Sequence, residues 1–205
     1  MFKAERETFK KVKYKIQGSS QEKVEFEKAL EKLLYEYDTS NWENRFVVGG
    51  ALEVLFCALL NSLGFYCRWI NEARFDLQIE DVKFSLKSNF TGSGNIRLIN
   101  VLSEEKVSWK EATLFFISEL GICYADPCMK LETKMKGDAL VIDTSQIKSF
   151  VQELQDWLIE IKIPRKPKRN TALKTASFDV AKAILLEMNS QYLLKNLPSL
   201  KEDEL

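Results

Sequence analysis

The sequence predicts one α/β or α+β domain built on a single mixed β-sheet. Two helical segments precede a run of short strand-like segments, and two further helical segments follow it. The chain has 205 residues, of which 45% are hydrophobic, so it can bury a core without disulfides. We expect a single domain over residues 1–205, with its core at about 20–160 and a C-terminal basic segment and helix at 162–197.

The first part of the chain is predicted to be mainly helical. Residues 1–18 alternate lysines with apolar side chains, which indicates either an edge strand or a basic arm. The serine pair at 19–20 can cap a helix that continues to Asp38. Segment 51–60 is apolar nearly all round and is followed by Gly64, which predicts a buried helix with a glycine stop.

The middle of the chain is predicted to form the sheet. Seven segments have strand character: 65–70, 74–79, 82–87, 96–102, 112–118, 121–125 and 139–143. A helix capped by Thr144 or Ser145 comes next, with apolar residues three and four apart. After Pro164 and Pro167, a last helix is predicted over 172–194, because Pro198 cannot continue it.

Composition excludes several classes of chemistry. The chain contains no histidine, which excludes Ser-His-Asp triads, Cys-His dyads and the histidine-bearing nuclease motifs. Its four cysteines include no C-x-x-C pair, so a zinc ribbon is not expected. We expect a reducing, cytoplasmic location. No run of eighteen consecutive apolar residues is present, which argues against a transmembrane helix. The charged N-terminus is unlike a secretory signal, and we interpret the acidic ending 202–205 as a solvated tail.

The segment 74–87 carries the most informative polar pattern. If residues 80–81 form a two-residue turn, alternation places Asp76 opposite Ser85, and Lys87 opposite Arg74, on one polar face. Glu-Asp is a poor hairpin dipeptide, so a longer loop with a shifted register is the alternative. The same pattern also fits a plain solvated hairpin face.

Glu53 is the one ionisable side chain between residues 51 and 60. A carboxylate in so apolar a helix needs a partner, because burying it alone is costly. A divalent metal or a lysine on the sheet could satisfy it, and a pair with Arg45 or exposure at the surface are the alternatives.

The pattern resembles the PD-(D/E)xK nuclease superfamily, and within it the type II restriction endonucleases. The resemblance covers about residues 45–145 and rests on an ordered set: Gly49, Glu53, Gly64, Asp76, Ser85 and Lys87. It implies a restriction-endonuclease-like mixed central β-sheet flanked by helices. It also implies an Mg²⁺-dependent DNA endonuclease, with Mn²⁺ as a substitute ion, that acts on double-stranded DNA as a homodimer.

The same resemblance assigns roles to individual residues. Asp76 and Glu53 are expected to hold Mg²⁺, and Lys87 to orient the attacking water and stabilise the transition state. Ser85 departs from the family pattern, because an acidic ligand is usual there. In some restriction enzymes a glutamate from elsewhere compensates, and Glu53 is the first candidate, with Glu80 second. If neither reaches the metal, the chain is a catalytically impaired nucleic-acid-binding module, or an interaction protein with a structural hairpin.

The remaining candidates are residues for contact with nucleic acid. Lys162, Arg165, Lys166, Lys168 and Arg169 crowd a segment without acidic residues, which indicates either a phosphate-contacting strap or a solvated loop. Asn89 lies in the glycine-rich stretch after Lys87, which is either a loop at the cleavage site or a plain turn.

Overall fold

The computed structural model describes residues 1–37, 39, 42–100, 107–165 and 176–199. Its helices are α1 (Lys3–Gly18), α2 (Gln21–Glu36), α3 (Trp42–Ser62), α4 (Thr144–Glu153) and α5 (Ser177–Glu187), with 3₁₀ turns at Gln155–Trp157 and Leu194–Asn196. Its strands are β1 (Cys67–Glu72), β2 (Phe75–Ile79), β3 (Val82–Asn89), β4 (Asn95–Asn100), β5 (Thr113–Ile117), β6 (Gly121–Ala125), β7 (Thr133–Lys136), β8 (Ala139–Asp143) and β9 (Leu158–Ile159). The mixed α+β class is therefore as the sequence predicts.

The described strands form two sheets, and not the single sheet that the sequence predicts. The larger sheet has the order β1-β2-β3-β5-β6-β9, with β3 and β5 parallel and its other neighbours antiparallel. A smaller antiparallel sheet has the order β4-β8-β7. Strand β7 has no counterpart among the predicted strands, because its mostly exposed side chains lack an apolar alternation.

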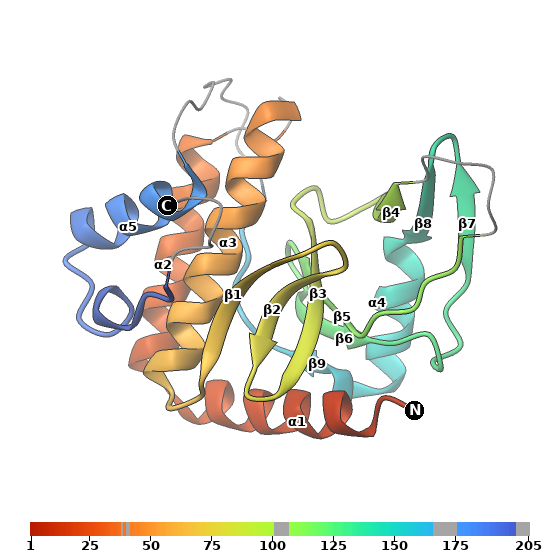
Figure 1. Ribbon diagram of the computed structural model, residues 1–205, viewed down its shortest axis with the longest axis horizontal. Helices are drawn as coiled ribbons and strands as arrows, with labels where there is room; N and C mark the ends of the chain where they lie inside the picture. Colours follow the sequence, from red (N-terminus) through yellow and green to blue (C-terminus); the bar gives the residue numbers. More distant parts are fainter. Residues whose placement is uncertain (38, 40–41, 101–106, 166–175, 200–205) are drawn as a thin grey trace.

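Each face of the larger sheet packs against a different layer. Leu114 and Phe116 of β5 belong to a core shared with helices α1, α2, α3 and α5. Their neighbours Phe115 and Ile117 point the opposite way and belong to a second core, shared with β4, β8 and α4. Figure 1 shows this arrangement, with α2, α3 and α5 on one side, the smaller sheet and α4 on the other, and α1 below.

The N-terminal segment is a helix, and the expectation of an edge strand or basic arm is wrong. Phe9, Val12 and Ile16 are buried at spacings of three and four residues, which is the period of a helix. The alternation at Val12, Tyr14 and Ile16 is misleading, because Tyr14 is 78% exposed.

An ion pair between the partly exposed Arg6 and the buried Asp126 attaches α1 to the larger sheet. The Arg6 guanidinium donates from Nε and Nη2 to Asp126, at 2.7 and 2.9 Å, and the Tyr124 hydroxyl donates to the same carboxylate at 2.8 Å. Burial raises the pKa of Asp126, but these hydrogen bonds outweigh it and hold that pKa below its usual value. The network therefore requires an ionised Asp126 in the folded chain.

Helix α3 is the buried helix that the sequence predicts, although it begins nine residues earlier. Gly64 has φ of +87° after its last turn, and the Phe65 amide donates to the Leu60 carbonyl at 3.0 Å, which is the expected glycine stop. Gly50 permits a close approach to α5, because a Cβ there would lie 2.5 Å from Ser177 Oγ.

The length and apolar character of α3 also pass a membrane-span test. Within the described residues, Asn44–Ser62 is the one helical stretch that qualifies, with a mean hydropathy of 1.5. Polar residues interrupt this stretch, so it contains no run of eighteen consecutive apolar residues. In the fold 61% of the stretch is buried inside the protein.

The C-terminal elements are shorter than predicted. The residue that caps α4 is Asp143, and not Thr144 or Ser145 as predicted. Its side chain accepts a hydrogen bond from the Ser145 amide. The predicted last helix is reduced in the described residues to α5, and residues 172–175 lie outside them, as does the acidic ending. The Glu25 carboxylate accepts hydrogen bonds from Ser190 Oγ and from three backbone amides of residues 191–193, and so attaches this end to α2.

Candidate functional site

The β2–β3 hairpin has the register that places the polar pattern on one face. Ile79 pairs with Val82 and Leu77 pairs with Phe84, as a two-residue connection requires. Glu80 adopts φ of +52° in this connection, and its carboxylate accepts a hydrogen bond from the Tyr66 amide at 3.0 Å. Glu80 is therefore used at the turn, at the end of the hairpin away from Asp76.

Ser85 and Lys87 both contact the Asp76 carboxylate. Asp76 Oδ2 accepts hydrogen bonds from Ser85 Oγ at 3.2 Å and from the Leu86 amide at 2.5 Å, and Lys87 Nζ lies 3.6 Å away. The hydrogen bond from the Leu86 amide fixes the direction of the Asp76 carboxylate, because this amide belongs to the backbone of the sheet. All these contacts use Oδ2, which leaves Oδ1 as the atom for a further ligand.

A cavity of about 520 Å³ opens in front of these three side chains. Among the described residues, its charged lining consists of three cations and two carboxylates: Arg74, Lys87, Lys110, Asp76 and Glu111. Leu98 and Ile99 of β4 contribute an apolar wall. The cavity therefore lies between the polar face of the hairpin and the smaller sheet.

Glu111 is the site residue that the sequence did not indicate. It is only 8% exposed, its Oε2 accepts a hydrogen bond from the Lys110 amide at 3.1 Å, and its Oε1 lies 3.7 Å from Arg74 Nε. The parallel pairing of Ser85 with Thr113 brings this segment beside β3. No local pattern predicts that pairing, because 27 residues separate Ser85 from the Thr113 with which it pairs.

Glu53 is not part of this cluster. Its Oε2 accepts a hydrogen bond of 2.6 Å from Trp69 Nε1. Trp69 is therefore a partner of this carboxylate, where we expected a metal or a lysine from the sequence. Trp69 pairs with Leu77, so both point to the helical side of the sheet, whereas Asp76 has the opposite parity. The structure thus separates Glu53 from Asp76 by the sheet, and the expected shared metal site is not formed by this pair.

The oxygen ligands in the cavity fit a metal that is held loosely. In the described part of the chain no group of three or more Asp, Glu, Cys or His side chains is placed to bind a metal. Asp76 and Glu111 provide two carboxylates, which is compatible with Mg²⁺, because that ion keeps several waters and is often bound by one or two carboxylates together with substrate phosphates.

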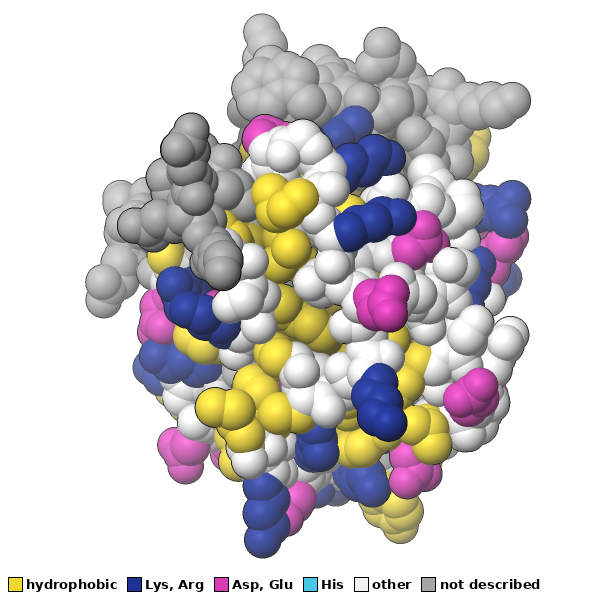
Figure 2. Space-filling model, turned by 90° about the vertical axis from the view of Figure 1, so that its right-hand side faces the viewer, with side chains coloured by type: hydrophobic (Ala, Val, Ile, Leu, Met, Phe, Trp, Pro, Cys, Tyr) yellow, Lys and Arg dark blue, Asp and Glu magenta, His cyan; other side chains and the backbone are white. Residues whose placement is uncertain are grey.

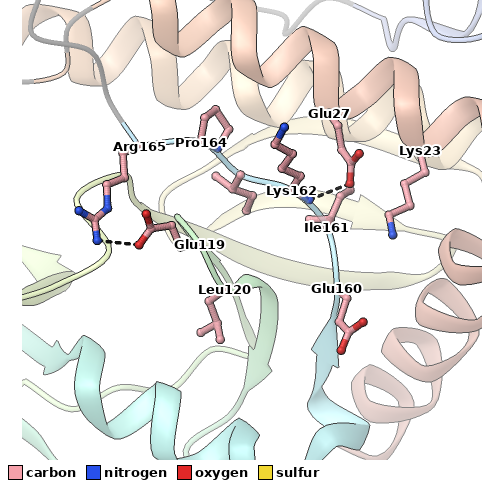
Figure 3. A pocket seen from close by; sticks show the side chains of 10 residues that line it. Lys23, Glu27, Glu119, Leu120, Glu160, Ile161, Lys162, Pro164 and Arg165 are labelled. Atoms are coloured by element: carbon pink, nitrogen blue, oxygen red, sulfur yellow. Dashed lines mark hydrogen bonds and ion pairs between the residues drawn. The ribbon is translucent and has the colours of Figure 1, made fainter.

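The described part of the basic segment lies far from the cavity. Lys162 and Arg165 line a separate groove of about 560 Å³, together with Glu119 of the β5–β6 turn (Figure 3). Arg165 Nη2 donates to Glu119 Oε2 at 2.6 Å, and the Lys162 amide donates to Glu27. Because Ser85 pairs with Thr113 at the start of β5, whereas Glu119 follows its end, the two sites lie beyond opposite ends of that strand.

The charges of this groove are balanced, with Lys23, Lys162 and Arg165 facing Glu27, Glu119 and Glu160. This balance favours a solvated surface over a phosphate contact at the two described residues. Lys166, Lys168 and Arg169 lie outside the described residues.

Asn89 organises a turn. Its Oδ1 accepts hydrogen bonds from the Thr91 and Gly92 amides, and its Nδ2 donates to the Ser93 carbonyl at 3.0 Å. These contacts favour the plain-turn interpretation of the stretch after Lys87.

Charge is mixed on the side of the molecule that carries the smaller sheet. Figure 2 shows Lys and Arg side chains interspersed with Asp and Glu around a band of hydrophobic side chains.

Comparison of the chain with family models, curated protein sequences and solved structures finds no match.

Proposed function

We propose that this chain is a metal-dependent DNA endonuclease of restriction type, with its catalytic site in the cavity in front of Asp76, Ser85 and Lys87. One observation carries the proposal. The register of β2 and β3 brings these three side chains together, in the order that resembles the PD-(D/E)xK motif. A restriction-endonuclease-like core is part of the same proposal.

The two carboxylates of the cavity are proposed to hold Mg²⁺, with Glu111 in the role that the sequence assigned to Glu53. When bound, the ion lowers the pKa of a coordinated water and neutralises charge on the scissile phosphate. Asp76 offers Oδ1 while its Oδ2 stays hydrogen-bonded to the sheet. Ser85 adds a neutral oxygen, which cannot replace a carboxylate.

The cations of the cavity act on the substrate in this proposal. Lys87 is 27% exposed and can turn its ammonium group from Asp76 towards the attacking water and the phosphoryl oxygens. Arg74 and Lys110 at the rim can contact neighbouring phosphates. Double-stranded DNA is the proposed substrate, and a homodimer is expected because symmetric DNA sites match a two-fold protein.

Cleavage of long, unmethylated DNA of mixed sequence tests the proposal. Wild-type protein should cut it with Mg²⁺ or Mn²⁺ and not with EDTA, and Asp76→Asn should abolish cutting while keeping the fold and the affinity for DNA. Asp156→Asn is the matched control, because that exposed carboxylate pairs with Lys10 and does not line the cavity. Equal cutting by wild type and Asp76→Asn would remove the cavity from the reaction.

A nucleic-acid-binding module without catalysis is the second candidate. Ser85 stands in place of an acidic ligand, and the described lining has three cations against two carboxylates; both features favour anion binding over metal binding. This candidate predicts salt-sensitive gel shifts that are lost in Lys87→Ala, without cutting under either metal.

A further inference from the structure

Two cysteine thiols touch each other in the core between α3 and β1. The Sγ atoms of Cys57 and Cys67 lie 2.9 Å apart, and the two residues are 0% and 3% exposed. A disulfide bond is about 2.03–2.05 Å long, so the two sulfurs need to approach by less than about 1 Å.

Neighbouring contacts keep the two thiols aligned. Glu53 and Cys57 lie one helical turn apart on α3, and Cys67 and Trp69 point to the same face of β1. The 2.6 Å hydrogen bond from Trp69 Nε1 to Glu53 Oε2 therefore lies beside the contact between the two thiols. On the other side, the Cys67 amide donates to Asn61 Oδ1 at 2.8 Å.

We propose that Cys57 and Cys67 form an oxidative modification site, at which a peroxide converts the two thiols into an intramolecular disulfide. Cys67, the less completely buried of the two residues, attacks the peroxide through its sulfur, and for hydrogen peroxide this gives a sulfenic acid and one water. The Cys57 sulfur then displaces the second water to form the S–S bond. Two electrons pass from the sulfurs to the peroxide oxygens, and the two thiol protons leave in the waters.

The other two cysteines cannot replace either partner in the folded chain. Cys123 belongs to the second core, on the far side of the larger sheet from Cys57 and Cys67. Burial also raises the pKa of the Cys123 thiol, which disfavours its reactive thiolate. Cys128 is exposed at the surface. A reaction within the native fold is therefore expected to link 57 with 67.

The disulfide should stabilise the protein. It closes a short loop across the α3–β1 connection, and closure of a loop of this size restricts the unfolded chain. For a chain of about 200 residues, the expected rise in Tm is about 5–10 °C. In a reducing compartment such a bond acts transiently, as in redox-sensing proteins.

Thiol counting on the full-length chain tests the proposal. In a Cys128→Ser background, which removes the exposed thiol, hydrogen peroxide should lower the count from three to one. Peptide mapping without reduction should find Cys57 linked to Cys67, and dithiothreitol should restore the thiols and the lower Tm. Cys57→Ala in the same background should form no intramolecular link, and Cys67→Ala is the second variant if the first is poorly folded.

Several outcomes overturn the proposal. Three thiols that persist under peroxide that oxidises free glutathione would show that the pair is inert. A link to Cys123, or a 57–67 link that forms only in denaturant, would show that the native contact is not the reactive one.

Discussion

Replacing Arg6 by methionine removes the cation that holds the buried Asp126 carboxylate and, with it, the main polar attachment of α1. Methionine keeps much of the apolar stem and the helix propensity of arginine. Asp126 is 0% exposed, so it cannot turn to water once its partner is lost. The Tyr124 hydroxyl and the Cys128 amide remain as donors, at 2.8 and 2.9 Å.

The expected loss is about 3 kcal/mol. Breaking a buried ion pair by removing one partner costs about 3–5 kcal/mol. The lower end applies because the Arg6 side chain is 33% exposed and because two donors remain. For a chain of this length, such a loss lowers Tm by about 6–12 °C.

The pH dependence of the two proteins should differ in sign. In wild type the pKa of Asp126 is lowered on folding, so its contribution is complete above about pH 4 and is lost as pH falls through the folded pKa. In Arg6→Met the lowering by Arg6 is lost, and we expect burial, the largest contribution, to raise the folded pKa above the unfolded one. The variant should then lose less stability than wild type as pH falls from 7, and the difference in Tm should shrink.

Thermal and urea unfolding between pH 4 and pH 7 measure both effects. Lys10→Met is the matched control, because its pair with Asp156 at 3.3 Å is exposed and exposed pairs contribute about 0–1 kcal/mol. Adding Asp126→Asn to Arg6→Met should recover part of the stability at pH 7. An Arg6→Met protein as stable as Lys10→Met would refute the assignment of this pair as the attachment of α1.

Three further predictions concern the cavity, the C-terminal end and the basic segment. Glu111→Gln should weaken Mn²⁺ binding measured by electron paramagnetic resonance and should abolish cleavage, whereas Glu53→Gln should lower Tm and leave both intact; the reverse pattern would restore Glu53 as the ligand. Burial raises the pKa of Glu25, but hydrogen bonds from residues 190–193 lower it by more, so the folded pKa lies below the unfolded one. Glu25→Gln should therefore lower Tm at pH 7, and the loss should become smaller as pH falls below about 4.5. Thermal unfolding at a series of pH values measures this. Replacing four basic residues by alanine should flatten the slope of log affinity for duplex DNA against log salt by up to about 3, because Arg165 already pairs with Glu119 and only the other three are expected to contact phosphate. An unchanged slope would make the segment a solvated loop. The four residues are Arg165, Lys166, Lys168 and Arg169.

Features that depend on short stretches of chain are predictable from the sequence. The register of β2 and β3 follows from the length of their connection and from alternation, and it alone brings Asp76 to Ser85. The end of α3 follows from Gly64, because only a residue that tolerates positive φ completes that turn. In both cases the determining contacts lie within about ten residues of each other.

Periodicity is ambiguous where a segment meets its neighbours in an unforeseen way. The first eighteen residues fit an alternating pattern almost as well as a helical one. Burial of Phe9, Val12 and Ile16 against the sheet and the ion pair with Asp126 select the helix. The partner of Arg6 lies 120 residues away, so no local signal announces it.

The sequence by itself determined a mixed α/β or α+β class and the buried helix, and it placed Asp76, Ser85 and Lys87 on one face of a hairpin on the condition that residues 80–81 form a two-residue turn, which the structure has. Tertiary structure alone decided that Glu111 lines the cavity and that Glu53 does not, because these depend on the parallel pairing of β3 with β5 and on the sheet face against which α3 packs. Tertiary structure also divided the described strands between two sheets and brought the thiols of Cys57 and Cys67 into contact. A face can be assigned within one strand from alternation, but which layer covers that face is set by packing between elements that are distant in the chain.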